Sequence, residues 1–149
     1  MSLKRIMPPT WLVAAVLLMV GLHVLLPVRR VVPRPFNYGG IVLIVAGVLV
    51  NIWADGLFKK RRTTVKPFET SSELVTDGPF RFSRHPMYVG MVAVLVGLAV
   101  LLGTAGPMPV VIGFVVLVRL HFIPAEERAL AETFGEAYRR YARRVRRWL

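Results

Sequence analysis

Four apolar segments, each about 17–19 residues long, limit how this chain can fold. They cover residues 10–27, 40–58, 87–103 and 107–124. An α-helix rises about 1.5 Å per residue, so each segment is near the lower limit for crossing the hydrocarbon layer of a membrane. None of them alternates between apolar and polar residues as a half-buried strand would. The sequence therefore predicts one all-α integral membrane domain over residues 1–149, with four transmembrane helices.

The composition narrows the possible partners. The chain is 55% hydrophobic and carries a net charge of +12. In a soluble protein such a charge would indicate nucleic acid binding, but here the basic residues lie between and after the apolar segments. Membrane lipids with anionic headgroups are therefore the expected partners, and nucleic acid is not. The chain has no cysteine, which excludes disulfides and thiolate chemistry, and its three histidines are scattered, so no metal site is expected.

The distribution of Lys and Arg predicts the orientation in the membrane. With the N-terminus inside, only Arg29, Arg30 and Arg34 of the 20 basic residues fall on the outer side. All eight acidic residues fall inside or at the inner surface. Because basic residues collect on the cytoplasmic side, we expect both termini in the cytoplasm of a cell whose inner or plasma membrane holds the protein.

Two polar segments complete the expected architecture. A cytoplasmic loop over residues 59–86 is long for a compact domain and contains several apolar residues, so we expect it to lie at the membrane surface. The tail over residues 125–149 carries one apolar stripe at spacings of three and four among many arginines. This pattern predicts an amphipathic helix lying in the membrane interface, and the same helix could also close a binding pocket.

The start of the third apolar segment is rich in groups that bind ligands. Pro86 suits the first turn of a helix, and the free N–H groups of that turn favour an anion. Arg84 and His85 add donors for a carboxylate or a phosphate, and Tyr88 follows one turn later. Gly90 would let a ligand or another helix approach closely. The alternative is a set of ordinary residues at the end of a membrane span.

Acidic and basic groups also lie at the inner ends of the second and fourth segments. Glu126 and Glu127 follow the fourth segment, where they suit either the start of a helix or a cationic or polyhydroxyl ligand. Asp55 is expected at the same depth as Arg119, so the two could form a neutral pair or take part in catalysis. The sequence has no Walker A motif and no dinucleotide-binding glycine turn.

Two blocks of the sequence resemble the isoprenylcysteine carboxyl methyltransferase family, which is related to phospholipid N-methyltransferases. The first is LVTDGPFRFSRHPMYVG at residues 74–90, and the second is EERALAETFGEAYRRY at residues 126–141. The resemblance implies S-adenosyl-L-methionine as the cofactor, held at the cytoplasmic membrane surface. It also implies a lipid-like methyl acceptor, either an isoprenylcysteine carboxylate for O-methylation or a phospholipid amine for N-methylation.

The resemblance and the residue chemistry together predict a site. His85, Arg119 and Asp55 are the candidate catalytic residues. The expected cofactor-binding residues are Leu74, Val75, Phe80, Arg84, His85, Pro86, Met87, Tyr88, Gly90, Glu126 and Glu127.

The sequence also departs from the family pattern. Ser72 and Phe80 stand where prenylcysteine enzymes tend to carry His and Tyr, so the cofactor is better supported than a prenylcysteine substrate. A membrane reductase using NADPH and a non-enzymatic lipid-binding protein are the alternative functions. The oligomeric state is not determined by the sequence.

Overall fold

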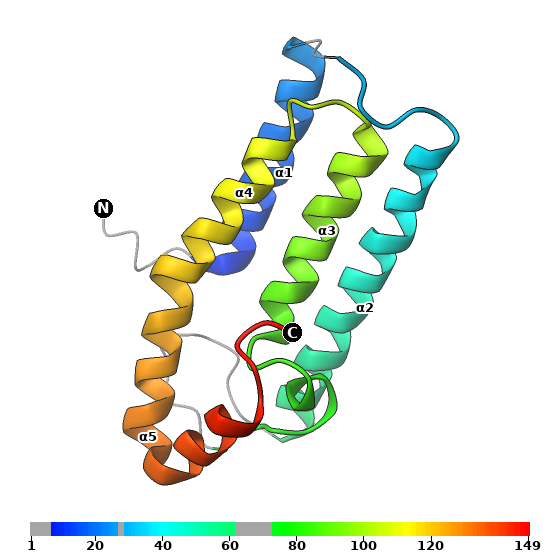
Figure 1. The fold of residues 1–149 in the computed structure, drawn as a ribbon. Helices are drawn as coiled ribbons and strands as arrows, with labels where there is room; N and C mark the ends of the chain where they lie inside the picture. Colours follow the sequence, from blue (N-terminus) through cyan, green and yellow to red (C-terminus); the bar gives the residue numbers. More distant parts are fainter. Residues whose placement is uncertain (1–6, 27–28, 62–72) are drawn as a thin grey trace.

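The computed structural model describes residues 7–26, 29–61 and 73–149 (Figure 1). Within these ranges the chain is helical, and its one β feature is an isolated bridge between Arg30 and Thr104. In chain order the elements are α1 (Pro8–Leu25), η2 (Phe36–Tyr38), α2 (Gly39–Lys60), η3 (Gly78–Arg81), α3 (Pro86–Leu102), α4 (Met108–Leu117), η4 (Val118–Phe122) and α5 (Ile123–Arg144).

The predicted all-helical class is confirmed. The first three helices begin and end within a few residues of the expected spans at 10–27, 40–58 and 87–103, whereas the helix of the fourth span continues past residue 124 to Arg144. Three helices are long and apolar enough to cross a membrane, namely Pro8–Leu25, Phe36–Lys60 and Met108–Arg144. The helix α3 is apolar as well but has only 17 residues. Its role as a fourth span therefore remains a prediction.

Proline and glycine fix the ends of the helices. Pro occupies one of the first two positions of α1, α3 and α4, where its missing N–H breaks no helical hydrogen bond. At the other end of α3, Gly103 has a φ of 71°, a left-handed conformation that stops the helix. The N–H groups of Val31 and Val32 then donate to the carbonyl oxygen of Gly103, which ties the loop after α1 to the end of α3.

The helix α3 lies at the centre of the bundle, with α2 on one side and α1 and α4 on the other (Figure 1). The main buried cluster joins α1, α3, α4 and the start of α5 and contains Ala15, Met19, Tyr88, Met91, Leu95, Ala99, Val111, Phe114, Val118, Phe122 and Ile123. A smaller cluster of Ala54, Val75 and Phe80 packs the segment before α3 against the end of α2. The two clusters together fix the start of α3 from both sides.

Glycines bring α2 and α3 into close contact. A Cβ added at Gly97 would lie 2.6 Å from the carbonyl oxygen of Gly40, and one at Gly90 would lie 2.7 Å from that of Gly47. Small residues at such crossings allow helices in a membrane to approach backbone to backbone. Of the two roles proposed for Gly90, contact with another helix is therefore the one that the structure shows.

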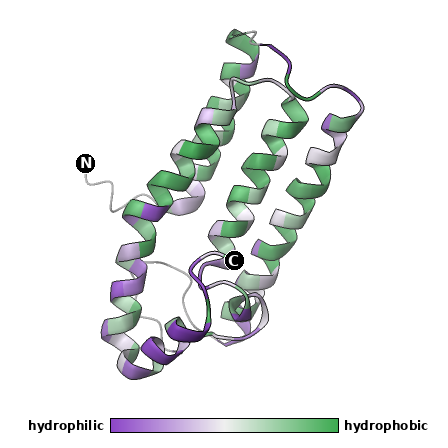
Figure 2. Cartoon of the chain, in the orientation of Figure 1, coloured by the Kyte–Doolittle hydropathy of each residue, from purple (hydrophilic) through white to green (hydrophobic). Residues whose placement is uncertain are grey.

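Outward-facing surfaces of α1 and α2 are apolar over most of their length (Figure 2). Leu17 and Val24 on α1 and Val42 and Ile52 on α2 are each more than half exposed. Exposed apolar surface of this extent marks contact with a membrane or a partner, and the apolar character of both helices favours a membrane. Polar residues gather instead where α2 ends, α3 begins and α5 runs, which we refer to as the polar end.

The helix α4 continues directly into α5 through η4, a turn of π-helix. A π turn has i→i+5 hydrogen bonds and so holds one residue more than an α-helical turn. The structure differs from the expected single tail helix over residues 125–149. At Gly135 the backbone takes a φ of 48°, the helix bends, and it ends at Arg144. The last residues then turn back toward the start of α3 (Figure 1), so the apolar stripe does not lie on one straight helix.

Candidate functional site

A partly open cavity of about 250 Å³ lies at the polar end. Small-molecule sites usually occupy roughly 300–1,000 Å³, so this cavity is close to the size that part of a nucleoside-containing ligand would need. Its lining comes from the starts of α1 and α3, the end of α2, η3 and α5, and consists of Met7, Pro8, Pro9, Asp55, Phe58, Phe80, Arg84, His85, Pro86, Met87, Tyr88, Met91 and Glu126. Eight residues predicted for the site therefore lie around one cavity.

The remaining predicted residues lie elsewhere. Val75 is buried in the small apolar cluster, and Leu74 lines a separate groove formed with the last part of α5. Gly90 faces α2, and Arg119 is exposed on η4. Ser72, which departs from the family pattern, is outside the described residues.

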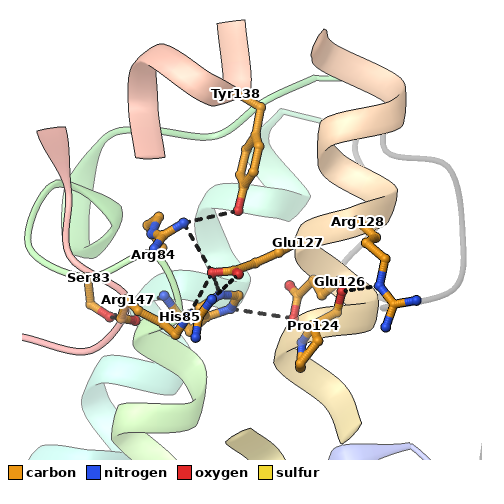
Figure 3. Close-up of polar contacts among 9 residues, drawn as sticks. All are labelled: Ser83, Arg84, His85, Pro124, Glu126, Glu127, Arg128, Tyr138 and Arg147. Carbon is orange, nitrogen blue, oxygen red and sulfur yellow. Dashed lines mark hydrogen bonds and ion pairs between the residues drawn. The ribbon is translucent and has the colours of Figure 1, made fainter. Parts of the chain in front are cut away.

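Glu127 was also predicted as a site residue, and it is the centre of a charged cluster beside the cavity (Figure 3). Its carboxylate accepts hydrogen bonds from Nε of Arg147 at 3.0 Å and from Nη2 of the same residue at 2.6 Å. Nη1 of Arg84 lies 3.1 Å from Oε1 of Glu127, and Nε2 of His85 lies 3.3 Å from the same oxygen. The side chain of Glu127 is only 14% exposed, so three cationic or protonatable groups surround a nearly buried carboxylate.

Backbone contacts hold this cluster in place. The hydroxyl of Ser83 accepts a hydrogen bond from the N–H of His85 and donates one to the carbonyl oxygen of Arg147. The N–H of Arg84 donates to the carbonyl oxygen of Arg146 at 2.9 Å. The side chain of Arg84 also reaches the hydroxyl of Tyr138 at 3.4 Å. The segment before α3 and the C-terminal tail therefore fix each other.

The cluster shifts the proton affinities of its members. Burial alone would raise the pKa of Glu127, but hydrogen bonds from His85 and Arg147 and the charges of Arg84 and Arg147 outweigh it and lower the pKa to about 2. Burial alone would lower the pKa of His85, but the two glutamates beside it raise the pKa above its usual value. Glu127 is therefore a carboxylate at any physiological pH.

This depressed pKa leads to a prediction about acid stability. Because the pKa of Glu127 is lower in the folded protein than in the unfolded chain, its stabilising effect is present above pH 4.5 and is lost as the pH falls toward 2. We expect the melting temperature in detergent to fall over this range, and to fall less in Glu127→Gln. Equal slopes for the two proteins would show that the carboxylate is not stabilised by the cluster.

Two buried polar atoms at the cavity lack a hydrogen-bond partner within the described residues: Nδ1 of His85 and Nε of Arg84. Nδ1 of His85 lies 3.6 Å from Oε2 of Glu126, beyond normal hydrogen-bond distance. The His85 residue as a whole is only 3% exposed. Buried polar atoms are usually satisfied, so these two atoms indicate where a polar ligand would bind.

The expected pairing of Asp55 with Arg119 is wrong. Asp55 instead forms an ion pair with Lys59, one helical turn further along α2, at 2.5 Å. Asp55 lines the cavity, whereas Arg119 is exposed on the outer side of η4 and makes no ion pair with any acidic residue that the structure describes. The two residues were expected at the same depth, but depth alone does not determine which way a side chain points.

Sequence reasoning missed several residues of the site. Arg147 was counted with the basic face of the tail, and Met7, Pro8 and Pro9, which come just before the first expected span at residues 10–27, were given no role. One feature of the sequence could have indicated the position of Arg147. Gly135 lies inside a helical pattern, and such a glycine can mark a bend that returns the chain toward the site. No sequence signal placed the start of α1 beside the start of α3.

Comparison with known proteins identifies the family. A model of the phospholipid methyltransferase family matches residues 36–137, which include α2, α3 and most of the cavity lining. The chain belongs to the phospholipid methyltransferase family. The matched region ends inside α5, so Arg147 lies beyond it.

Relatives of this family member include proteins named as isoprenylcysteine methyltransferases. A probable protein-S-isoprenylcysteine O-methyltransferase from Oryza sativa subsp. indica is 33% identical over 113 residues, covering 73% of this chain and 58% of the rice protein. Protein-S-isoprenylcysteine O-methyltransferase B from Arabidopsis thaliana is 40% identical over 80 residues, covering 52% and 39%. The expected relation to isoprenylcysteine methyltransferases is thereby confirmed.

This chain and its relatives overlap over only part of their lengths. The chain spans little more than half the length of the rice relative and less than half of the Arabidopsis one. An uncharacterized protein from Haemophilus influenzae is 36% identical over 63 residues, which cover 42% of this chain and all of that protein. No solved structure matches the chain.

Proposed function

We propose that this protein transfers a methyl group from S-adenosyl-L-methionine to a lipid-like acceptor at the cytoplasmic surface of a membrane. The observation that carries the proposal is the cavity at the polar end. It combines Arg84, His85 and Glu126 with apolar walls, in a chain whose family is that of phospholipid methyltransferases. We also propose that α3 spans the membrane as a fourth helix and that both termini are cytoplasmic, as the distribution of basic residues favours.

The residues present fit the parts of this cofactor. Arg84 and His85 would hold its carboxylate, because both line the cavity and each has a buried nitrogen with no hydrogen-bond partner among the described residues. Glu126 would accept hydrogen bonds from its ammonium group or a ribose hydroxyl. Apolar walls from Phe58, Phe80, Met87 and Met91, joined by Pro8, would pack against its apolar surface. Glu127 is left out, since Arg84, His85 and Arg147 already occupy its carboxylate.

When bound, the cofactor supplies a methyl group on a positively charged sulfur, ready for displacement. The protein contributes mainly position and orientation, which can lower a barrier by several kcal/mol. The apolar part of the lining would keep water away from the reacting groups once the cofactor is bound. A carboxylate acceptor needs no base, whereas an amine acceptor must lose a proton, which Asp55 or His85 could accept at the cavity wall. Arg119 could contribute only at a distance, because it lies outside the cavity.

The acceptor is expected to be a molecule with a polar reactive group and an apolar body, reaching the site from the membrane. The cavity is lined by the starts of α1 and α3 and the end of α2, and α1 and α2 expose apolar surface along their length. An isoprenylcysteine carboxylate and a phospholipid amine both have this chemistry. The names of the relatives support the first acceptor, and the name of the family supports the second.

Calorimetry of the purified protein in detergent, with S-adenosylhomocysteine as the ligand, tests the proposal. Glu126→Gln is expected to weaken binding by about ten- to a hundredfold, the effect of losing a hydrogen bond to a charged group. Glu132→Gln is the matched control, because Glu132 is an exposed acid on the same helix. Binding of NADPH in place of S-adenosylhomocysteine would support a reductase, and binding of neither would favour a lipid-binding protein.

A further inference from the structure

We propose that Arg147 is a positioning residue of the candidate site, holding Glu127 so that Glu127 in turn orients the side chain of His85 at the cavity. The importance of Arg147 for catalysis rests on the proposed function. The contacts from which we infer its role are made between protein side chains and involve no ligand. Arg147 does not line the cavity, so its effect on the site would pass through other side chains.

The C-terminal tail is held at three successive residues, which fixes where Arg147 lies. The carbonyl oxygen of Arg146 accepts a hydrogen bond from the N–H of Arg84, and that of Arg147 accepts one from the hydroxyl of Ser83. Trp148 packs against the main buried cluster. The guanidinium of Arg147 is therefore presented to Glu127 by a fixed backbone rather than by a loose end.

The contact between Arg147 and Glu127 is the strongest constraint on that carboxylate. Two hydrogen bonds, at 3.0 and 2.6 Å, join the two side chains. A planar guanidinium that binds a carboxylate at two points fixes its orientation, which a single contact does not. Without Arg147, Glu127 would keep only the contacts from Arg84 and His85, both of which are made to the single oxygen Oε1. Arg147 thus sets the direction in which Glu127 faces His85.

The ring of His85 has two nitrogens and two different neighbours. Nε2 faces Glu127 at 3.3 Å, and Nδ1 faces Glu126 and the cavity at 3.6 Å from the Glu126 carboxylate. A firm contact at Nε2 leaves Nδ1 directed at the cavity. If Glu127 were released, the ring could turn and pair with either glutamate, so the cavity would lose one defined polar group.

The test compares five variants of the full chain by calorimetry with S-adenosylhomocysteine, the fourth and fifth being Glu127→Gln alone and combined with Arg147→Gln. Arg147→Gln is expected to weaken binding by about tenfold, and Arg147→Lys, which keeps the charge but not the two-point contact, should fall between it and the wild type. Arg143→Gln removes the same charge from an exposed residue on the last turn of α5 and should bind as the wild type does. In the background of Glu127→Gln, the change Arg147→Gln should add nothing.

A second measurement needs no ligand and separates failure of this inference from failure of the proposed function. Titration of the His85 ring by NMR separates release of Glu127 from the loss of one positive charge. If Glu127 stayed in contact with Nε2, the loss of the Arg147 charge alone would raise the pKa of His85. Release of Glu127 instead removes a contact that raises this pKa, so we expect a lower pKa of His85 in Arg147→Gln and no change in Arg143→Gln. Glu126 and Tyr88 also face this ring, Arg84 contacts the same Glu127 oxygen, and all three stay the same in both variants. A raised or unchanged pKa of His85 in Arg147→Gln would overturn the inference. So would a loss of binding that persists in the Glu127→Gln background. If the wild type binds no S-adenosylhomocysteine, the proposed function fails, while the titration still decides the role of Arg147.

Discussion

His85→Ala is expected to weaken the binding of S-adenosylhomocysteine by about ten- to a hundredfold, the value of roughly 1.5–3 kcal/mol for a hydrogen bond to a charged group. His85 is nearly buried at the start of α3, with one nitrogen toward Glu127 and the other toward the cavity. Its removal takes a polar group from the cavity wall and leaves Glu127 with two partners instead of three. Both effects act against a polar ligand.

Loss of binding must be separated from loss of folding, because a buried histidine in a charged cluster also contributes to stability. His121→Ala provides the matched control, since His121 is exposed on η4 away from the cavity. The melting temperature of each variant in detergent should be measured beside its affinity. We expect both variants to remain folded, with affinity lost only in His85→Ala. Equal affinities would mean that His85 does not touch the ligand.

Gly47→Leu is expected to destabilise the bundle by about 1–3 kcal/mol or to prevent its folding, because it forces extra atoms into a packed contact. A Cβ at this position would overlap the carbonyl oxygen of Gly90 and lie 2.9 Å from a methyl group of Val94. Backbone atoms of a helix cannot move aside as a flexible side chain can. The two helices must therefore separate, and α2 would carry Asp55 and Phe58 away from the cavity.

Gly56→Leu is the control for this change, since a Cβ at Gly56, also on α2, would meet nothing within 4 Å. Both variants replace a glycine by the same residue in the same helix, so any difference comes from contact with α3. The melting temperature in detergent is expected to fall for Gly47→Leu and to change little for Gly56→Leu. Similar values for the two would show that α2 and α3 do not pack through this glycine.

The sequence was sufficient to predict the helices because their lengths and apolar character follow from what a membrane requires. It also predicted that Arg84, His85 and Glu126 would meet. Each comes directly before or after an apolar segment, and those ends were expected on one side of the membrane. The order of the segments was thus enough to predict that these three residues lie at the same depth. The structure agrees, because all three line the cavity at the polar end.

Contacts around the bundle could not be predicted in the same way. Asp55 and Arg119 were placed at one depth, yet one faces the cavity and the other faces outward, because the rotation of each helix depends on packing against its neighbours. The role of Arg147 depends on the bend at Gly135, where a positive φ turns the chain back. A glycine in a helical pattern allows such a bend but does not require it.

Glu126 and Glu127 have different roles in the structure, which their adjacent positions in the sequence did not reveal. They are neighbours in the sequence and were equal candidates for a ligand contact. In the structure Glu126 lines the cavity, while Glu127 is held by Arg84, His85 and Arg147. Successive residues on a helix point about 100° apart, so one faces the cavity and the other faces the tail.

Because each residue turns a helix by about 100°, the π turn η4 affects where the chain can tolerate an insertion or a deletion. The turn holds one residue more than a regular turn, so everything after it is displaced by one position relative to α4. Removing one residue from Val118–Phe122 could convert the turn to regular α-helix and keep α4 and α5 in phase. Removing one residue from the straight part of α4 would instead rotate α5 by about 100°, exchanging the directions of Glu126 and Glu127 with those of their neighbours. The length of chain between α4 and the glutamates is thus a constraint on the site, separate from the identity of any residue in it.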